Sequence, residues 1–214
     1  MAMKKGDVLA RLEKAGIVAV VREQTETHAL KAAQAVVDGC ILGLEITFSV
    51  PNAASVITRL KKMYSSSSEV VVGAGTVLDA ITARFAIMSG AEFIVSPSFN
   101  LETAQVCNLY QVPYLPGCMT ITEMQQAMIS GVEIVKLFPA NNFEPSLIKS
   151  VKAPLPQISI MPTGGINLEN LLTWKEAGAA LVGVGGNLFK GVSENDYEQV
   201  QNTATAYIKK WQQA

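Results

Sequence analysis

Eight short apolar segments, separated by longer segments of helical period, run along the 214 residues and predict a closed barrel of parallel strands surrounded by helices. Helix-capping residues and glycines fall between these segments, and polar residues recur at their carboxyl ends. Both features are expected of a (β/α)8 barrel, in which functional groups gather at the carboxyl ends of the strands. We therefore predict an α/β fold: a single (β/α)8 TIM barrel domain over residues 1–214, with an extra N-terminal helix.

The predicted strands are short runs of mostly apolar residues. They span residues 17–22, 43–48, 70–75, 92–97, 112–117, 133–139, 158–164 and 180–186. The extra helix is predicted over residues 4–15, and the serine run 65–68 is predicted to be a loop on the N-terminal face of the barrel.

The intervening helices carry recognisable start and stop signals. Thr25, Asn100 and Thr120 are predicted N-caps, Thr120 forms a capping box with Glu123, and Pro51 is predicted to open a helix. Four glycines are predicted to end helices, namely Gly39, Gly90, Gly131 and Gly178.

The composition favours a small-molecule partner. A net charge of −1 with scattered cations predicts neither nucleic-acid binding nor attraction to an anionic membrane. No segment approaches 18 apolar residues and the first residues lack the apolar core of a signal peptide, so we expect neither export nor a membrane span. Three cysteines without paired spacing fit a reducing cytoplasm. Since His28 is the only histidine and acidic residues do not cluster at strand ends, we expect no metal site and no cofactor.

Lys136 lies inside the apolar segment IVKLFPA, residues 134–140. Strand alternation places Lys136 and Phe138 on one face and Val135 and Leu137 on the other. Burial disfavours the ammonium form of a lysine, and a neutral amine is a nucleophile that attacks ketones. The alternative is a lysine whose side chain reaches water from the end of a strand.

Glu45 lies between two aliphatic residues of the second predicted strand, where alternation would direct Glu45, Thr47 and Ser49 into the barrel. A glutamate in this position suggests a functional carboxylate, the alternative being an exposed edge. Arg22 and Thr76 follow the first and third predicted strands, so they should lie at the same rim.

Two glycine pairs follow the last two predicted strands: Gly164 with Gly165, and Gly185 with Gly186, the latter followed by Asn187. In barrels of this class, backbone amides of these two loops commonly hold a phosphate. The pairs therefore predict a phosphate or carboxylate site, the alternative being ordinary turns.

Taken together, these segments resemble the family of 2-keto-3-deoxy-6-phosphogluconate (KDPG) aldolases, including members that also cleave 4-hydroxy-2-oxoglutarate. The resemblance covers almost the whole chain and is carried, in the family's order, by GIVAVVR, LEITF, VVGAGTV, FIVSP, LPGCMT, VKLFPA, PTGGI and GVGGNLF.

The resemblance implies a Schiff-base aldolase that uses no metal. Lys136 would form the imine with the keto carbon, Glu45 would move protons, and Thr76 would bind the pyruvyl part. The distal phosphate would be held by Thr163, Gly164, Gly165, Gly185 and Gly186. Arg22, Thr47, Pro97, Phe138 and Asn187 complete the implied substrate-binding set. The implied partners are a 2-keto acid and pyruvate, and the implied assembly is a homotrimer.

One position departs from the family pattern. Some members carry an arginine four residues after the glutamate to bind an anionic group, and this chain has Ser49 there. Arg22 is the candidate to supply the missing charge. Three alternatives to a KDPG substrate stay open: the galactonate epimer, chiefly 4-hydroxy-2-oxoglutarate, or a sugar-phosphate binding barrel without catalysis. A buried lysine argues against the last, because a binding protein has no use for a desolvated amine.

Overall fold

The computed structural model describes residues 5–192 and 195–213. Its centre is a parallel sheet of eight strands, each preceded or followed by a helix, as predicted. The strands are β1 (Ile17–Val21), β2 (Gly43–Thr47), β3 (Val71–Gly75), β4 (Ile94–Ser96), β5 (Tyr114–Cys118), β6 (Ile134–Leu137), β7 (Ser159–Pro162) and β8 (Val182–Val184).

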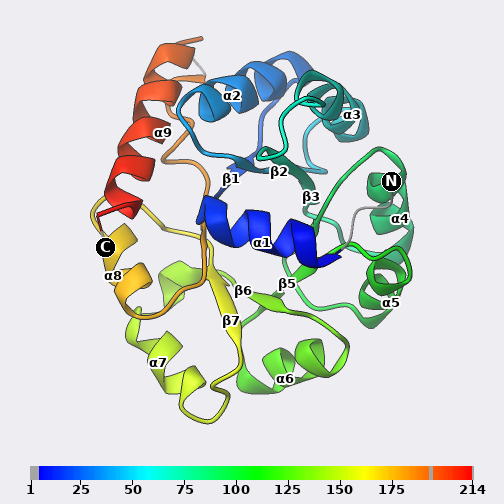
Figure 1. Ribbon diagram of the computed structural model, residues 1–214, viewed down its shortest axis with the longest axis vertical. Helices are drawn as coiled ribbons and strands as arrows, with labels where there is room; N and C mark the ends of the chain where they lie inside the picture. Colours follow the sequence, from blue (N-terminus) through cyan, green and yellow to red (C-terminus); the bar gives the residue numbers. More distant parts are fainter. Residues whose placement is uncertain (1–4, 193–194, 214) are drawn as a thin grey trace.

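The helices form a ring around these strands (Figure 1). They are α1 (Lys5–Ala15), α2 (Glu26–Asp38), α3 (Ala53–Met63), α4 (Ala80–Met88), α5 (Leu101–Leu109), α6 (Ile121–Ile129), α7 (Ser146–Lys152), α8 (Leu171–Glu176) and α9 (Tyr197–Trp211), with a 3-10 turn η1 (Ala140–Asn142) after β6.

The strand order is β7-β6-β5-β4-β3-β2-β1-β8, and the two end strands meet. A parallel bridge pairs Thr163 with Gly183, and the Ala180 N–H donates to the Ile160 carbonyl at 3.0 Å. Closing the sheet in this way removes its edges and brings the carboxyl ends of all the strands to one rim.

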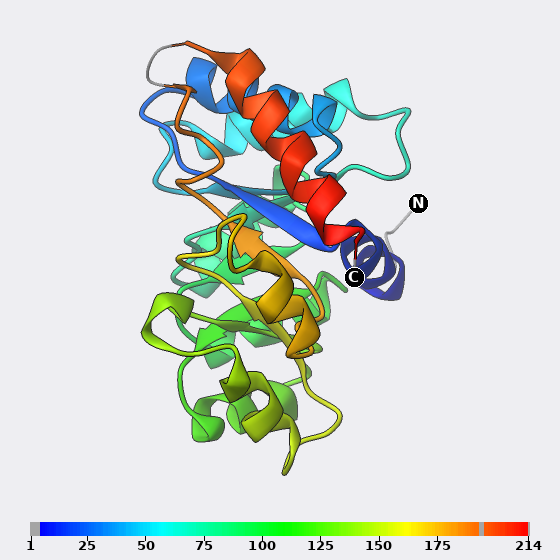
Figure 2. The ribbon, with the colours of Figure 1, turned by 90° about the vertical axis from the view of Figure 1, so that its left-hand side faces the viewer.

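Two apolar layers follow from the strand alternation. Inward-facing side chains such as Val71, Phe93 and Met161 fill the barrel, and outward-facing side chains such as Val135 and Leu137 pack in the layer beneath the helices. Helix α1 crosses one end of the barrel, where Val8 and Leu12 join the interior cluster (Figures 1 and 2). The extra helix therefore closes the N-terminal end of the barrel.

Most of the predicted boundaries agree with the structure. Thr25, Asn100 and Thr120 are N-caps, and Thr120 and Glu123 form the predicted capping box. The fourth, sixth, seventh and eighth strands are shorter than predicted by three or four residues, at 94–96, 134–137, 159–162 and 182–184. The prediction for Pro51 was wrong, because α3 begins two residues later after Asn52, which has a left-handed backbone and makes no side-chain cap.

A buried carboxylate fastens α1 and α3 to the barrel at the end closed by α1. Glu92 is 2% exposed and lies just before β4. It pairs with Arg11 of α1 at 2.6 Å and with Lys61 of α3, and it accepts a hydrogen bond from the Val72 N–H at 3.2 Å. Burying a carboxylate costs free energy unless such partners surround it. Removing the carboxylate would in turn leave these partners without their acceptor.

We expect Glu92→Ala to lower the free energy of unfolding by about 3 kcal/mol, because it leaves two half-buried cations and a buried N–H without their acceptor. The matched control is Glu69→Ala, which removes the exposed Lys14–Glu69 pair of 2.7 Å at the same end and should have a much smaller effect. Urea unfolding at one protein concentration measures both variants. Equal losses would show that Glu92 is no more important than a surface pair.

Candidate active site

Lys136 and Glu45 face each other inside the barrel. They come from β6 and β2, and their Nζ and Oε1 atoms are 3.7 Å apart. The two side chains are 6% and 1% exposed, respectively, so both are removed from bulk water. Strand alternation correctly predicted that Glu45 points into the barrel and that Lys136 lies on the face opposite Val135 and Leu137.

Gly75 makes room for the Glu45 carboxylate. It lies at the end of β3, beside β2, and a Cβ atom built on it would lie 2.0 Å from Glu45 Oε1. Any side chain at this position would displace the carboxylate. Gly75 was not predicted as a site residue, although a glycine within a strand often marks a close approach of this kind.

Two buried oxygen atoms at the site have no hydrogen-bond partner among the described residues: Glu45 Oε2 and Thr163 Oγ1. Buried polar atoms are rarely left unpaired in proteins, because the cost is of the order of a lost hydrogen bond. Contacts within the protein therefore leave the hydrogen-bonding capacity of the site unfilled, and both oxygen atoms are available to a bound polar group. The Lys136 Nζ atom lies 4.9 Å from the centroid of the Phe138 ring.

Arg22 and Thr76 meet at the rim. The Arg22 Nη2 donates to Thr76 Oγ1 at 3.3 Å, and Thr76 has a left-handed backbone with φ of 56°. Thr47 is fully buried below them, whereas Ser49 lies in the turn after β2 and is exposed. Ser49 was expected to continue the inward-facing side of the strand, but β2 ends at Thr47 and Ser49 lies in the following turn, with its Oγ 2.8 Å from Thr47 Oγ1.

The predicted phosphate-site residues line one cavity of about 330 Å³ at the same rim. Its walls are Val20, Arg22, Phe138, Thr163, Gly164, Gly165, Ile166, Gly185, Gly186, Asn187 and Phe189. Val20, Ile166 and Phe189 were not predicted and supply its apolar surface. The cavity therefore combines one guanidinium group with two glycine loops.

The first glycine loop has a conformation that other residues adopt with difficulty. Gly164 and Gly165 have φ of 103° and 74°, and a Cβ on Gly165 would lie 2.8 Å from the Cβ of Asn141. By contrast, a Cβ on Gly186 would meet nothing within 4 Å. In the second loop, Asn187 Nδ2 donates to the Ile166 carbonyl at 3.3 Å, which ties the two loops together.

Two other residues near the strand ends lie outside this cavity lining. Pro97, after β4, packs against β5 so closely that a Cβ on Gly117 would lie 2.0 Å from the Pro97 carbonyl oxygen. Cys118, at the end of β5, is 2% exposed, and burial raises the pKa of its thiol to about 12. Cys118 is therefore a thiol rather than a nucleophilic thiolate at neutral pH.

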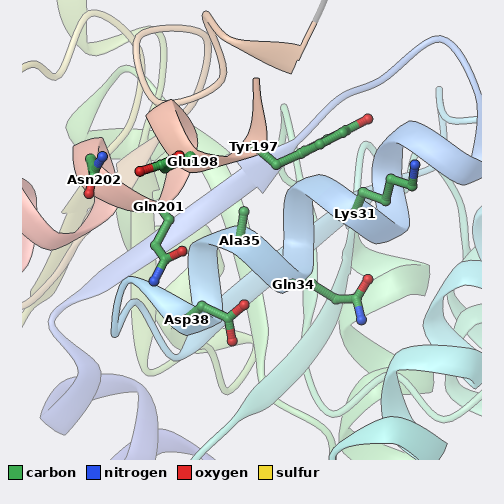
Figure 3. A pocket seen from close by; sticks show the side chains of 8 residues that line it. All are labelled: Lys31, Gln34, Ala35, Asp38, Tyr197, Glu198, Gln201 and Asn202. Atoms are coloured by element: carbon green, nitrogen blue, oxygen red, sulfur yellow. The ribbon is translucent and has the colours of Figure 1, made fainter. Parts of the chain in front are cut away.

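A larger hollow, of about 620 Å³, lies on the outside of the barrel between α2 and α9 (Figure 3). Its lining is mostly polar, and the Lys31 amine lies 5.5 Å from the centroid of the Tyr197 ring. None of the predicted site residues lines it. The smaller cavity at the strand ends is the candidate active site, because it is lined by Phe138, whose ring lies beside the buried Lys136 amine.

The described part of the chain brings no three His, Cys, Asp or Glu side chains together in an arrangement suited to a metal ion. Over the same residues, no helix has the length and apolar character needed to cross a bilayer. The reactive groups inside the barrel are a buried amine and the carboxylate beside it. Such a pair suits nucleophilic attack on a carbonyl carbon with local proton transfer.

Comparison with known proteins agrees with this chemistry. Residues 8–203 match the model of the "KDPG and KHG aldolase" family. The chain is 31% identical to 2-dehydro-3-deoxy-6-phosphogalactonate aldolase of Escherichia coli, covering 94% of this chain and 97% of the relative. It is 32% identical to 2-dehydro-3-deoxy-phosphogluconate aldolase of Treponema pallidum, covering 90% and 92%.

Among solved structures, the fold is similar to a KDPG aldolase from Legionella pneumophila with pyruvate captured as a covalent carbinolamine. The TM-score is 0.83 at 25% identity, covering 97% of this chain and 99% of that one. The family match spans most of the chain and includes the strands that carry Lys136 and Glu45. The chain therefore belongs to the KDPG and KHG aldolase family and is an aldolase, a carbon–carbon lyase.

Proposed function

We propose that this aldolase cleaves KDPG to pyruvate and glyceraldehyde 3-phosphate through an imine on Lys136. The observation that carries the proposal is the buried Lys136–Glu45 pair, 3.7 Å apart, next to a cavity lined by glycine loops and Arg22. The covalent pyruvate adduct of the Legionella relative supports the same chemistry. The whole barrel domain, residues 1–214, would serve as one catalytic unit.

In the proposed mechanism, the Lys136 amine adds to the C2 carbonyl to give a carbinolamine, which loses water to give a protonated imine. Glu45 accepts and returns the protons of these steps. Glu45 then removes the proton of the C4 hydroxyl, and the C3–C4 bond breaks. Its electron pair moves through the imine to give an enamine, while C4 leaves as the aldehyde. Glu45 returns the proton to C3, and hydrolysis releases pyruvate and the free amine.

The two anionic ends of the substrate have separate partners in this proposal. Arg22 and Thr76, which meet at 3.3 Å, would bind the carboxylate and replace the arginine that some family members carry at the position of Ser49. The phosphate would lie against the glycine loops and Asn187. Backbone amides of such loops are suited to anions, and each charge-assisted hydrogen bond is worth about 1.5–3 kcal/mol.

The remaining predicted residues would shape the space between these ends. Thr163 has a buried hydroxyl without a partner and would bind a substrate oxygen. Phe138, whose ring lies beside the Lys136 amine, would pack against the pyruvyl part. Pro97 would form part of the surrounding wall on the β4 side, and Thr47 would lie behind the binding space on the β2 side.

Two other substrates are candidates for the same site. The galactonate epimer is favoured by the 31% identity to the Escherichia coli galactonate enzyme over 97% of its length. The other candidate, 4-hydroxy-2-oxoglutarate, would give pyruvate and glyoxylate. Pyruvate release from each keto acid, coupled to lactate dehydrogenase, ranks the three substrates by kcat/KM. Release of pyruvate from none of them would overturn the proposed substrates and favour the alternative of a sugar-phosphate binding barrel.

We further propose a homotrimer in the cytoplasm. Helix α4 is apolar on two faces: Ala83 and Ala86 are buried, while Ile81, Phe85 and Met88 are 83%, 56% and 67% exposed. A helix that is apolar on its outer side usually packs against another protein surface, which here would be a second copy of this chain.

The cysteines support the proposed compartment. Cys40, Cys107 and Cys118 are free, which fits a reducing compartment.

The imine predicts a covalent label on one lysine. With pyruvate and borohydride, which reduces the imine to a stable amine, we expect the added mass on Lys136 in peptide mapping and a parallel loss of activity. Lys136→Ala should be inactive and unlabelled, and Lys31→Ala, which changes an exposed lysine, should behave as the wild type. A label on another lysine would refute the assignment.

Glu45→Gln keeps the shape of the side chain and removes the base. We expect kcat to fall roughly 10²–10⁴-fold with a much smaller change in KM, because proton transfer is lost and substrate contacts are kept. Glu102→Gln, on the exposed first turn of α5, is the matched control. Steady-state kinetics measures both, and a near-normal kcat for Glu45→Gln would exclude its role as the base.

The glycine loops predict that phosphate raises efficiency. We expect a higher kcat/KM for KDPG than for 4-hydroxy-2-oxoglutarate, and we expect Gly186→Asp to abolish this preference by placing a negative charge at the cavity. A Cβ fits freely at Gly186, so Gly186→Asn is the neutral control of equal size and should keep the preference. Equal efficiency of the wild type on both substrates would show that the glycine loops are ordinary turns.

A further inference from the structure

Thr47 makes a hydrogen-bonded link between two strand ends at the rim. Its Oγ1 lies 3.0 Å from the carbonyl oxygen of Val21, the last residue of β1, and 2.8 Å from the Oγ of Ser49. Thr47 itself is 0% exposed and ends β2. The link therefore joins β1, β2 and the turn after β2 directly below the opening of the barrel.

The direction of each hydrogen bond in this link follows from the number of donors and acceptors that its groups have. A threonine hydroxyl has one hydrogen, and the Val21 carbonyl can only accept, so Thr47 donates to Val21. The Ser49 hydroxyl must then donate to Thr47. Both hydroxyl hydrogens are used inside the protein, and neither is free for a ligand.

The residue that follows the Val21 carbonyl is Arg22. The regular pairing of β1 with β2 ends at Val21 and Ile46, so Arg22 lies beyond the last pair. Its side chain reaches Thr76, which follows β3, and β2 lies between β1 and β3 in the sheet. Arg22 therefore extends past the end of β2, where Thr47 holds the preceding carbonyl and the small Ser49 occupies the turn.

We propose that Thr47 and Ser49 are positioning residues that fix the end of β1 and so direct Arg22 toward the carboxylate of the keto acid. This inference rests on the proposed function, in which Arg22 and Thr76 bind that carboxylate. It assigns Ser49 a role of its own: its hydroxyl completes the link, and its small size leaves the path of Arg22 open. Thr47 acts through Arg22 rather than by contact with substrate.

The test measures the pyruvate concentration that gives half-maximal borohydride labelling of Lys136. Thr47→Val keeps the shape and removes the hydroxyl, and we expect this concentration to rise roughly tenfold. Thr47→Ser keeps the hydroxyl and should have the same half-maximal pyruvate concentration as the wild type. In keto-acid cleavage, Thr47→Val should raise KM more than it lowers kcat. The control is Thr103→Val, a change at another buried threonine, on α5.

A double-mutant cycle separates positioning from direct contact. Arg22→Ala should raise the half-maximal pyruvate concentration at least as much as Thr47→Val. Adding Thr47→Val to Arg22→Ala should then have no further effect, because Thr47 acts through Arg22. Additive effects, or an unchanged value in Thr47→Val alone, would overturn the inference.

Ser49→Ala tests the same link without changing the buried Thr47. Because Ser49 is exposed, removing its hydroxyl should not disturb folding. We expect it to raise the half-maximal concentration by roughly threefold, because Thr47 loses only its supporting donor. An unchanged value would remove Ser49 from the link and contradict the proposal. Failure of the wild type to form any pyruvate adduct would instead overturn the proposed function itself, and with it this inference.

Discussion

The burial of Lys136 against Glu45 is the interaction on which the rest of the structure depends. Removing two charged groups from water costs several kcal/mol for each, and their attraction compensates only when the surroundings hold them in place. Here the surroundings are a closed sheet whose backbone groups are already paired, a missing side chain at Gly75, and apolar layers below. Helix α1 completes this enclosure from the opposite end.

Parallel strands of a closed barrel also explain how distant parts of the chain act together. Arg22, Glu45, Thr76 and Lys136 lie on four different strands or directly after them. Because all of the strands run the same way, their carboxyl ends share one rim, and short loops can place reactive groups there without disturbing the core. At the opposite end, the ion pairs of Glu92 hold α1 and α3 in place, so this structural cluster and the candidate active site occupy different ends of the barrel.

The sequence was sufficient to predict features that depend on local periodicity. Alternation correctly directed Glu45 into the barrel and placed Lys136 on the face opposite Val135 and Leu137, and the capping box at Thr120 follows from residues three apart. What the sequence did not reveal depends on contacts between segments far apart in the chain. The space that Gly75 leaves for Glu45 and the bond from Thr47 to Val21 exist only after strands pair, and local propensity contains no information about them.

The sealing of one end of the barrel by α1 has a kinetic consequence. In the proposed reaction, substrate and products would enter and leave by the rim, and the buried Lys136 amine would lie at the inner end of that path. In the proposed reaction, the pyruvyl half of the substrate is bonded to Lys136, while the other half lies nearer to the opening. The aldehyde must therefore depart before the tethered half can be hydrolysed and follow it, and in the synthetic direction the two reactants must arrive in the reverse sequence. In the proposed reaction, the covalent bond to Lys136 would therefore give an ordered mechanism, in which the acceptor aldehyde meets an enzyme that already carries the enamine.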